Sequence, residues 1–237
     1  VYNHKFLEGK KVIVSDIEDA LNLLDENGSE VLLDLAWKYK SNINFIRYCK
    51  DNVERKQIED LSLRVQEEAV NKRDEISKID KSKTLEPYKT AVREFENIMD
   101  AYWFLSEEIE KWVSTIEELS CSDIKKLSNE QIIFYKDVSK VIHAIDNRLE
   151  LRGRDSFGLS VVIKSEKFNN KKSLENIDET YNFYTSGEDE VHTFTFKTCS
   201  SIGGLGDNAR EIKDLLKKNK YFNRLIQNTK IISATIM

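Results

Sequence analysis

Proline is nearly absent from this sequence of 237 residues, since Pro87 is the only one. Glycine is scarce in the first 150 residues, where only Gly9 and Gly28 occur among the chain's eight glycines. Because both residue types interrupt regular structure, their scarcity favours long helices there. The remaining glycines follow residue 150, so the composition changes there from helical to turn-rich. We expect a domain boundary near that change.

Cysteine is scarce, and long apolar runs and an excess of positive charge are absent. Cys49, Cys121 and Cys199 have no metal-site spacing. Three cysteines in such a chain fit a reducing environment, so we expect a cytoplasmic protein. No apolar run reaches the ~20 residues that a membrane span needs. The formal net charge of −5 disfavours nucleic acid and anionic membranes as partners.

Helical periodicity dominates the first part of the chain. Ile58, Leu61, Val65 and Ala69 follow one another at spacings of 3 or 4 residues, which predicts a helix over residues 53–83. Residues 88–119 give the strongest pattern, with an apolar residue at every third or fourth position: Val92, Phe95, Met99, Tyr102, Leu105, Ile109, Trp112, Ile116 and Leu119. We expect the two helices to form an antiparallel coiled-coil arm within a helical insertion spanning residues 15–128.

Three consecutive aromatic residues, Tyr102, Trp103 and Phe104, lie in the second helix of this arm. Neighbouring positions on a helix point in different directions, so these rings cannot all face one core. Either the helix is packed on two sides, or Trp103 contacts a partner. The first alternative is our expectation.

The segment from Leu149 to Ile163 marks a change from helix to strand. Ser128 and Gln131 form a capping-box pattern that predicts the start of the preceding helix. After a polar corner at residues 152–156, an apolar residue recurs at every second position, which predicts a strand. The apolar residues are Phe157, Leu159, Val161 and Ile163. Gly158 suggests a close approach to the strand backbone.

This segment, which reads LELRGRDSFGLSVV over residues 149–162, resembles a known family. Glucosamine-6-phosphate synthase, a class II glutamine amidotransferase, carries LEYRGYDSAGLAVV in its glutaminase domain. The later landmarks follow in the same order, with a strand at 193–197, a glycine loop at 202–206, a helix, and a strand at 230–236. The resemblance covers residues 145–237. It implies an α+β fold, with part of an N-terminal-nucleophile αββα sandwich over residues 129–237 and with residues 1–14 as a lead-in to its sheet.

The resemblance also implies an activity. Enzymes of this family release ammonia from glutamine and pass it to an acceptor, here a sugar phosphate, without a cofactor or metal. By resemblance Arg152 lies near the nucleophile, and Gly153, Asp155 and Ser156 bind substrate. Arg154 and Phe157 depart from the family's tyrosine and alanine. The alternative for this corner is a helix end whose dipole is complemented by basic residues.

The catalytic motifs of the family lie outside this sequence. The family begins Met-Cys-Gly, whereas this chain begins with Val1, and the family's His-Thr-Arg-Trp motif would follow Met237. We therefore expect the parent protein, rather than this chain alone, to be the enzyme. The alternative function is a non-catalytic helical module that joins copies of the chain, or a protein partner, through the arm.

Two further patterns carry less specific signals. The glycines at 203, 204 and 206 could cradle a phosphate with backbone amides, but no Lys-Ser/Thr pair follows as in a P-loop, and a structural turn is favoured. The three histidines of the chain are scattered, with no pair four residues apart for a metal.

Overall fold

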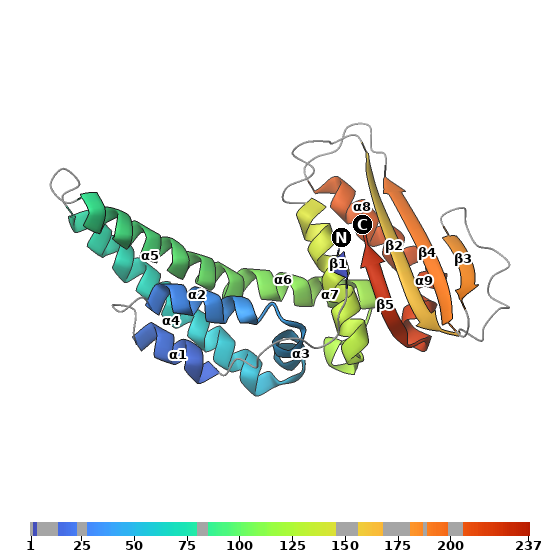
Figure 1. Cartoon of the computed structure of the whole chain (residues 1–237), viewed down its shortest axis with the longest axis horizontal. Coiled ribbons are helices and arrows are strands. Elements are labelled where there is room, and N and C mark those ends of the chain that lie inside the picture. The colour runs from blue at the N-terminus through green and yellow to red at the C-terminus, as the bar shows by residue number, and fades with distance from the viewer. Residues whose placement is uncertain are drawn as a thin grey trace. The chain divides into compact units, whose positions relative to one another are not determined.

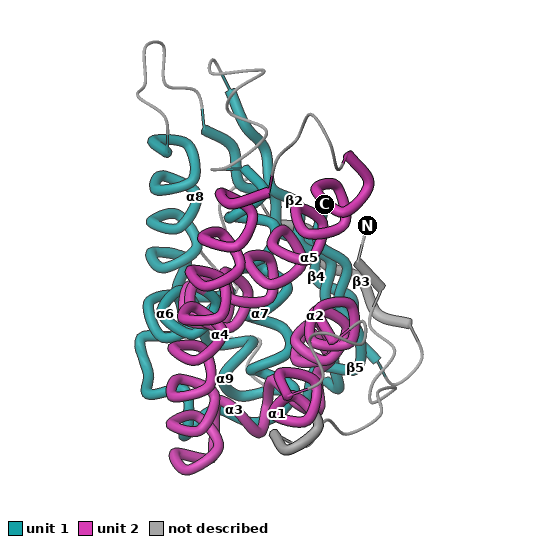
Figure 2. Tube along the Cα trace, turned by 90° about the vertical axis from the view of Figure 1, so that its left-hand side faces the viewer, with its two compact units in different colours: residues 1–5, 112–237 teal, residues 6–111 magenta. Residues whose placement is uncertain are grey.

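The computed structural model describes residues 2–3, 14–22, 28–79, 85–145, 156–167, 181–186, 189–198 and 206–237. The chain divides into two compact units, which Figure 2 colours separately. The helical unit comprises residues 6–111, and the α+β unit comprises residues 1–5 and 112–237. The chain combines helices with a sheet, so it belongs to the α+β class. The sequence divided it at residues 15 and 129, whereas the compact units change at residues 6 and 112.

The helical unit is built around two long antiparallel helices, α4 and α5 (Figure 1). Its elements are α1 (Val14–Asn22), α2 (Gly28–Lys38), α3 (Asn42–Lys50), α4 (Asn52–Lys78), α5 (Leu85–Trp103), the π-helical turn η2 (Phe104–Glu108) and the beginning of α6 (Ile109–Ser120). The antiparallel order is fixed by two ion pairs, Lys72–Glu94 and Arg55–Glu110, each with a nitrogen–oxygen distance of 2.6 Å. The predicted seam of α4, from Ile58 to Ala69, is buried.

Helix α5 forms as predicted, but it packs through a different face. The buried residues of α5 are Ala91, Ile98 and Ala101, whereas Met99 is exposed and Val92 is half-buried. The two alanines have short side chains, which allow neighbouring helices to approach this face closely. The expectation that the helix is packed on two sides is wrong at Trp103, whose exposed fraction is 47%.

The α+β unit contains one antiparallel five-stranded sheet in the order β1-β5-β2-β4-β3. Its strands are β1 (Tyr2–Asn3), β2 (Phe157–Glu166), β3 (Tyr181–Ser186), β4 (Asp189–Thr198) and β5 (Ile231–Ile236). Its helices are the rest of α6, the 3-10 turn η3 (Ile124–Lys126), α7 (Asn129–Ala144), α8 (Asp207–Lys218) and α9 (Lys220–Asn228). The strand predicted after the polar corner is therefore β2, at the centre of this sheet.

Helices α7, α8 and α9 cover one face of the sheet. Leu159, Val161 and Ile163 on β2 are fully buried there, as the alternating pattern predicted. The ring of Phe222 on α9 lies 5.1 Å from that of Phe194 on β4 and 5.8 Å from that of Phe134 on α7. Aromatic packing of this kind holds the helix layer on the sheet.

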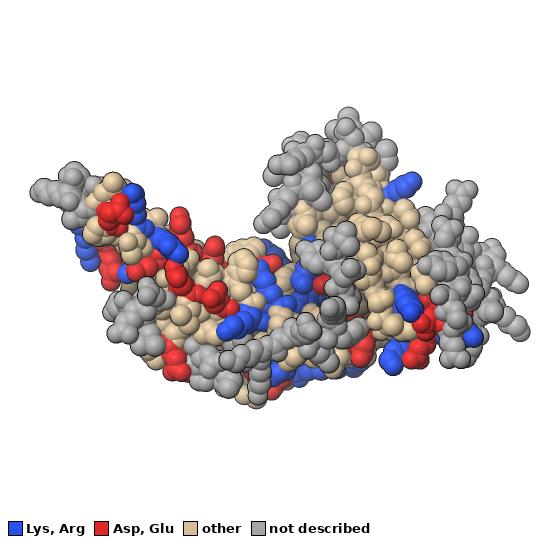
Figure 3. Space-filling model, viewed as in Figure 1, with Lys and Arg blue, Asp and Glu red and all other residues tan. Residues whose placement is uncertain are grey.

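The opposite face of the sheet, which we call the open face, carries small or uncharged residues along β2, β4 and β5. They are Gly158, Ser160, Val162, Thr193, Thr195, Ser233 and Thr235. Among these seven, Gly158 is exposed and the others are half-buried. The same face also carries Lys197 of β4, which is exposed and pairs with Gly158. Figure 3 shows a broad area without charged side chains over these strands. Lys164 and Asp189 form an ion pair of 2.7 Å beside it.

Two local features differ from the expectations. Strand β4 extends beyond the predicted 193–197 segment, from Asp189 to Thr198, and the helix predicted after the glycine loop is divided at Asn219, whose side chain caps α9. The last residue of the predicted glycine loop, Gly206, is the cap of α8, with a φ of 89°. Glycine suits this position because it adopts left-handed backbone angles without strain.

Candidate functional site

One end of the sheet brings together segments from opposite ends of the chain. Phe157 at the start of β2 pairs with Thr198 at the end of β4. Ile236 at the end of β5 pairs with Tyr2 of β1. Ser160 and Met237 exchange two backbone hydrogen bonds of 2.9 Å. Ser156 and the start of β2 therefore lie at the end of the sheet where β5 finishes, and this end is the candidate site.

The predicted site residues are only partly described. Arg152, Gly153 and Asp155 lie outside the described residues, and their predicted roles stay predictions. Ser156 is described, immediately before β2, and is exposed. The close approach expected at Gly158 is not found among the described residues, because an added Cβ would meet only the Phe196 carbonyl oxygen, at 3.8 Å. That distance is an ordinary contact.

The first turn of α8 is attached to the same end of the sheet. Thr198 Oγ1 donates a hydrogen bond of 2.7 Å to Asn208 Oδ1, and both side chains are buried. Gly203 and Gly204, the candidate phosphate cradle, lie outside the described residues. Asn208 therefore holds α8 to β4.

A buried polar cluster lies farther along the sheet, on its helix-covered face. His192 Nε2 is 3.3 Å from Ser165 Oγ and 3.7 Å from Glu190 Oε2. A hydrolytic triad needs the serine and the carboxylate on opposite ring nitrogens and an open approach to the serine. Here both groups meet the same nitrogen, and Ser165 is fully buried. The cluster therefore joins β2 to β4 and is not a nucleophilic site.

The environment of His192 keeps its ring neutral. Burial lowers the pKa of His192 below its ordinary value of 6.5, and the nearby charge of Glu190 opposes that change only in part. The ring of Tyr221 on α9 lies 6.2 Å from the imidazole ring. A neutral imidazole held in this way helps to join β2 to β4 within the sheet.

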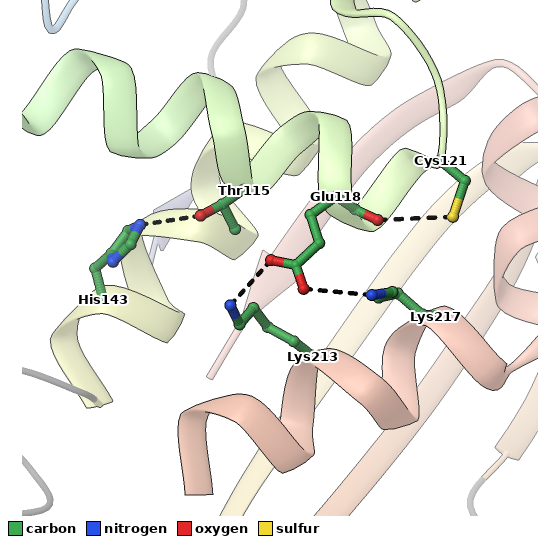
Figure 4. Close-up of polar contacts among 6 residues, drawn as sticks. All are labelled: Thr115, Glu118, Cys121, His143, Lys213 and Lys217. Atoms are coloured by element: carbon green, nitrogen blue, oxygen red, sulfur yellow. Dashed lines mark hydrogen bonds and ion pairs between the residues drawn. The ribbon is translucent and has the colours of Figure 1, made fainter. Parts of the chain in front are cut away.

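A second polar cluster connects helices of the α+β unit, as Figure 4 shows. Glu118 on α6 accepts hydrogen bonds from Lys213 and Lys217 on α8, at 2.9 and 3.3 Å. Burial alone would raise the pKa of Glu118, but the hydrogen bonds and charges of the two lysines outweigh it and lower that pKa. Thr115 Oγ1 lies 3.2 Å from His143 Nε2. These contacts hold α6 against α8 and α7.

Neither cluster is predicted by the sequence, for different reasons. Alternation predicts that His192 shares one side of its strand with Phe194 and Phe196, whereas polar composition favours a turn at Glu190 and a loop at Ser165. Strand alternation continued through both segments would place Ser165 and Glu190 on the inner faces of their strands. Glu118 and Lys213 are 95 positions apart, and no local pattern indicates such a pair.

Comparisons with known proteins found no relative of this chain. No family model, curated protein or solved structure matches the chain. Within the described residues, no group of three or more His, Cys, Asp or Glu side chains is arranged to hold a metal ion. None of the described helices is long and apolar enough to cross a membrane.

Proposed function

We propose that this chain carries part of the glutaminase domain of a class II glutamine amidotransferase of the glucosamine-6-phosphate synthase type. The domain releases ammonia from glutamine for transfer to an acceptor, with a sugar phosphate as the proposed acceptor. One observation carries the proposal. The strand that follows the LELRGRDS segment is the central strand β2, and β5, which the resemblance puts before His-Thr-Arg-Trp, is its direct neighbour.

The arrangement of segments at the candidate site supports the same proposal. The corner containing Arg152 leads into β2 at the end of the sheet where β5 finishes and β1 begins. In the resembling family, the arginine lies close to the amino-terminal cysteine. The order β1-β5-β2, with one strand between the segment near the amino terminus and the strand that follows Arg152, supports a similar approach in the parent protein.

The two faces of the sheet support the finer fold that the resemblance implies. In an αββα sandwich each sheet is covered by helices on one face and packs against the second sheet on the other. Here α7, α8 and α9 cover one face, and the open face carries small side chains such as Ser160 and Thr195. Sheets pack about 10 Å apart, and the small uncharged residues in the middle of this face suit that separation, with Lys197 and Lys164 toward its two ends.

The proposed chemistry needs one amino-terminal cysteine. Its thiolate attacks the side-chain amide carbon of glutamine, and its α-amine takes up a proton and delivers it to the leaving ammonia. Water then hydrolyses the glutamyl thioester to glutamate. An α-amine with a pKa of roughly 8 exchanges protons readily near neutral pH. The internal residues Cys49, Cys121 and Cys199 cannot supply both groups, so the nucleophile lies outside this sequence.

The decisive test uses the natural gene product that contains residues 1–237 in its sequence. We expect ammonia release from glutamine, complete loss on replacing the amino-terminal cysteine of the parent protein by alanine, and a loss of about tenfold or more in kcat/KM for Arg152→Ala. Arg154→Ala is the matched control, because Arg154 lies on the other side of Gly153 and stands where the family has tyrosine rather than arginine. We expect it to retain most activity.

Two results would contradict the proposal. One is a gene product without the Met-Cys-Gly start, because no other residue offers a thiol and an α-amine together. The other is equal ammonia release by the wild type and the cysteine variant. Far-UV circular dichroism and a thermal melt of each variant show whether lost activity reflects chemistry or unfolding.

A further inference from the structure

Helix α5 carries two apolar stripes, and the fold buries only one of them. The inner stripe, with Ala91, Ile98 and Ala101, is buried. The second stripe, which we call the outer stripe, repeats at alternating spacings of three and four residues along the helix: Leu85, Tyr88, Val92, Phe95, Met99 and Tyr102. Leu85 is 55% exposed and Met99 is 37% exposed. None of the six outer-stripe residues is fully buried.

The outer stripe lies away from the helices that cover the α4–α5 pair. Arg93 of α5 forms an ion pair with Glu30 of α2, which marks the side that α2 occupies. At 3.6 residues per turn, Met99 is turned about 120° from Arg93 around the helix axis. Helices α1 and α2 contact each other and cover α4 and α5 from that side. The outer stripe therefore faces away from α2.

Helix α4 has exposed apolar residues of its own, on the side opposite to its buried seam. Leu63 and Val70 are seven residues apart, so they share one side of α4, and they are 58% and 44% exposed. Leu63 is turned about 160° from the buried Leu61, so it does not extend the outer stripe of α5.

The spacing of the outer stripe suits pairing with an identical helix. Residues that alternate at three and four positions form the seam of a two-stranded coiled coil. Two copies of α5 running in opposite directions would pair Leu85 with Tyr102, Tyr88 with Met99, and Val92 with Phe95. The three pairs occur twice around a two-fold axis, giving six layers. The stripe covers 18 positions, or about 27 Å at 1.5 Å per residue.

The charges beside the outer stripe favour this orientation. Lys89 and Glu96 are both exposed and lie on the same flank of the stripe, seven residues apart. In an antiparallel pair, Lys89 of one copy faces Glu96 of the other, and this contact occurs twice. In a parallel pair, this flank would face the buried Ala91 and Ile98 positions instead. Opposite charges beside a seam select the partner and its orientation.

The surroundings of the stripe disfavour a lipid surface. On the flank of the stripe the exposed Lys89 and Glu96 balance each other, and the chain as a whole carries a formal net charge of −5. An excess of acidic groups repels anionic headgroups. We infer that the outer stripe of α5 binds the same stripe of a second copy of this chain, in antiparallel orientation, to form a two-fold symmetric dimer.

The test is sedimentation velocity of the chain between about 1 and 100 µM, where weak interfaces dissociate. We expect a concentration-dependent dimer. Met99→Glu should weaken dimerisation at least about tenfold, because it sets an unpaired charge in the seam. Thr90→Glu is the matched control, since Thr90 is exposed and lies on another side of α5. It should dimerise like the wild type.

A charge exchange tests the orientation without altering the apolar layers. Lys89→Glu should weaken the dimer, because it brings two carboxylates together, and the double change Lys89→Glu with Glu96→Lys should restore it. A wild-type chain that stays monomeric throughout the range would overturn the inference, as would a Met99→Glu variant that dimerises normally while its circular dichroism matches the wild type. A double variant that does not recover the dimer would overturn the antiparallel pairing.

Discussion

The two units of this protein differ in how completely they bury their large apolar side chains. Among the described residues, every exposed large hydrophobic side chain except Met237 belongs to the helical unit: Val31, Trp37, Val53, Leu63, Val70, Leu85, Met99 and Trp103. In the α+β unit, the apolar side chains Trp112, Val113, Ile116 and Leu119 of α6 and Leu159, Val161 and Ile163 of β2 are buried. Apolar periodicity thus predicts which face of an element is apolar, but burial depends on what the rest of the chain supplies.

The largest expected effect compares two tryptophans on either side of this division. Trp112 is 2% exposed and Trp103 is 47% exposed. Trp112→Ala should lower the free energy of unfolding by about 3–5 kcal/mol, because it empties a packed site. Trp103→Ala should lower that of the monomer by less than about 1 kcal/mol. Urea unfolding followed by far-UV circular dichroism measures both free energies. Similar losses would show that the two tryptophans do not differ in how much their packing stabilises the protein.

The next comparison uses neighbouring residues on opposite faces of β2. Ile163 is fully buried beneath the helices, and Val162 is half-buried on the open face. Ile163→Ala should cost about 2–5 kcal/mol of unfolding free energy, and Val162→Ala less than about 1 kcal/mol. The same urea titrations of the 237-residue chain provide the measurement. A cost at Val162 that matches the cost at Ile163 would show that the open face is already covered.

A smaller effect concerns how the unfolding free energy depends on pH through the buried His192. Burial lowers the folded-state pKa of His192 below 6.5, so the unfolded chain binds the proton more readily. Stability should therefore fall as the pH drops below about 6.5, by at most about 1.4 kcal/mol per pH unit, until the folded-state pKa is passed. Unfolding free energies of wild type and His192→Asn between pH 5 and 8 report this difference. Parallel curves would show that the imidazole is not the group responsible.

The smallest effect concerns the ion pairs of Glu118. The carboxylate is 37% exposed, so solvent screens its attraction to Lys213 and Lys217. Glu118→Gln should cost about 0.5 kcal/mol of unfolding free energy at pH 7. Because its folded-state pKa is lowered below 4.5, the contribution is present above pH 4.5 and is lost as the pH falls through the folded-state value. Glu211→Gln, on an exposed position of α8, is the control; an equal cost there would mean that the lysines add nothing.

Local patterns predicted much of the fold. The capping box at Ser128 and Gln131 forms with both hydrogen bonds, and the apolar alternation of β2 gave its buried face correctly. Each signal depends on residues a few positions apart, whose geometry is set by the backbone itself. The buried seam of α4 was predicted for the same reason.

Long-range contacts explain what the sequence did not show. The face through which α5 packs is decided by α2 and α4, and Val92 and Ala91 are both compatible with a helical seam. The division between α8 and α9 depends on Asn219, whose amide oxygen accepts from the Phe222 amide and starts a new helix. At the candidate site, the neighbouring strands are described, while the roles of Arg152, Gly153 and Asp155 stay predictions that the ammonia assay addresses.

The π-helical turn η2 (Phe104–Glu108) has a consequence for how this chain tolerates insertions and deletions. A π turn closes hydrogen bonds over five residues instead of four, so it holds about one residue more than an α turn. In a regular helix each residue turns the chain by about 100°, whereas a π turn absorbs its extra residue within the turn itself. Deleting one residue from η2 would therefore leave an ordinary α turn, and the residues that follow would keep their direction. A one-residue deletion here should be tolerated better than one in the middle of α4, where it would rotate half of the buried seam.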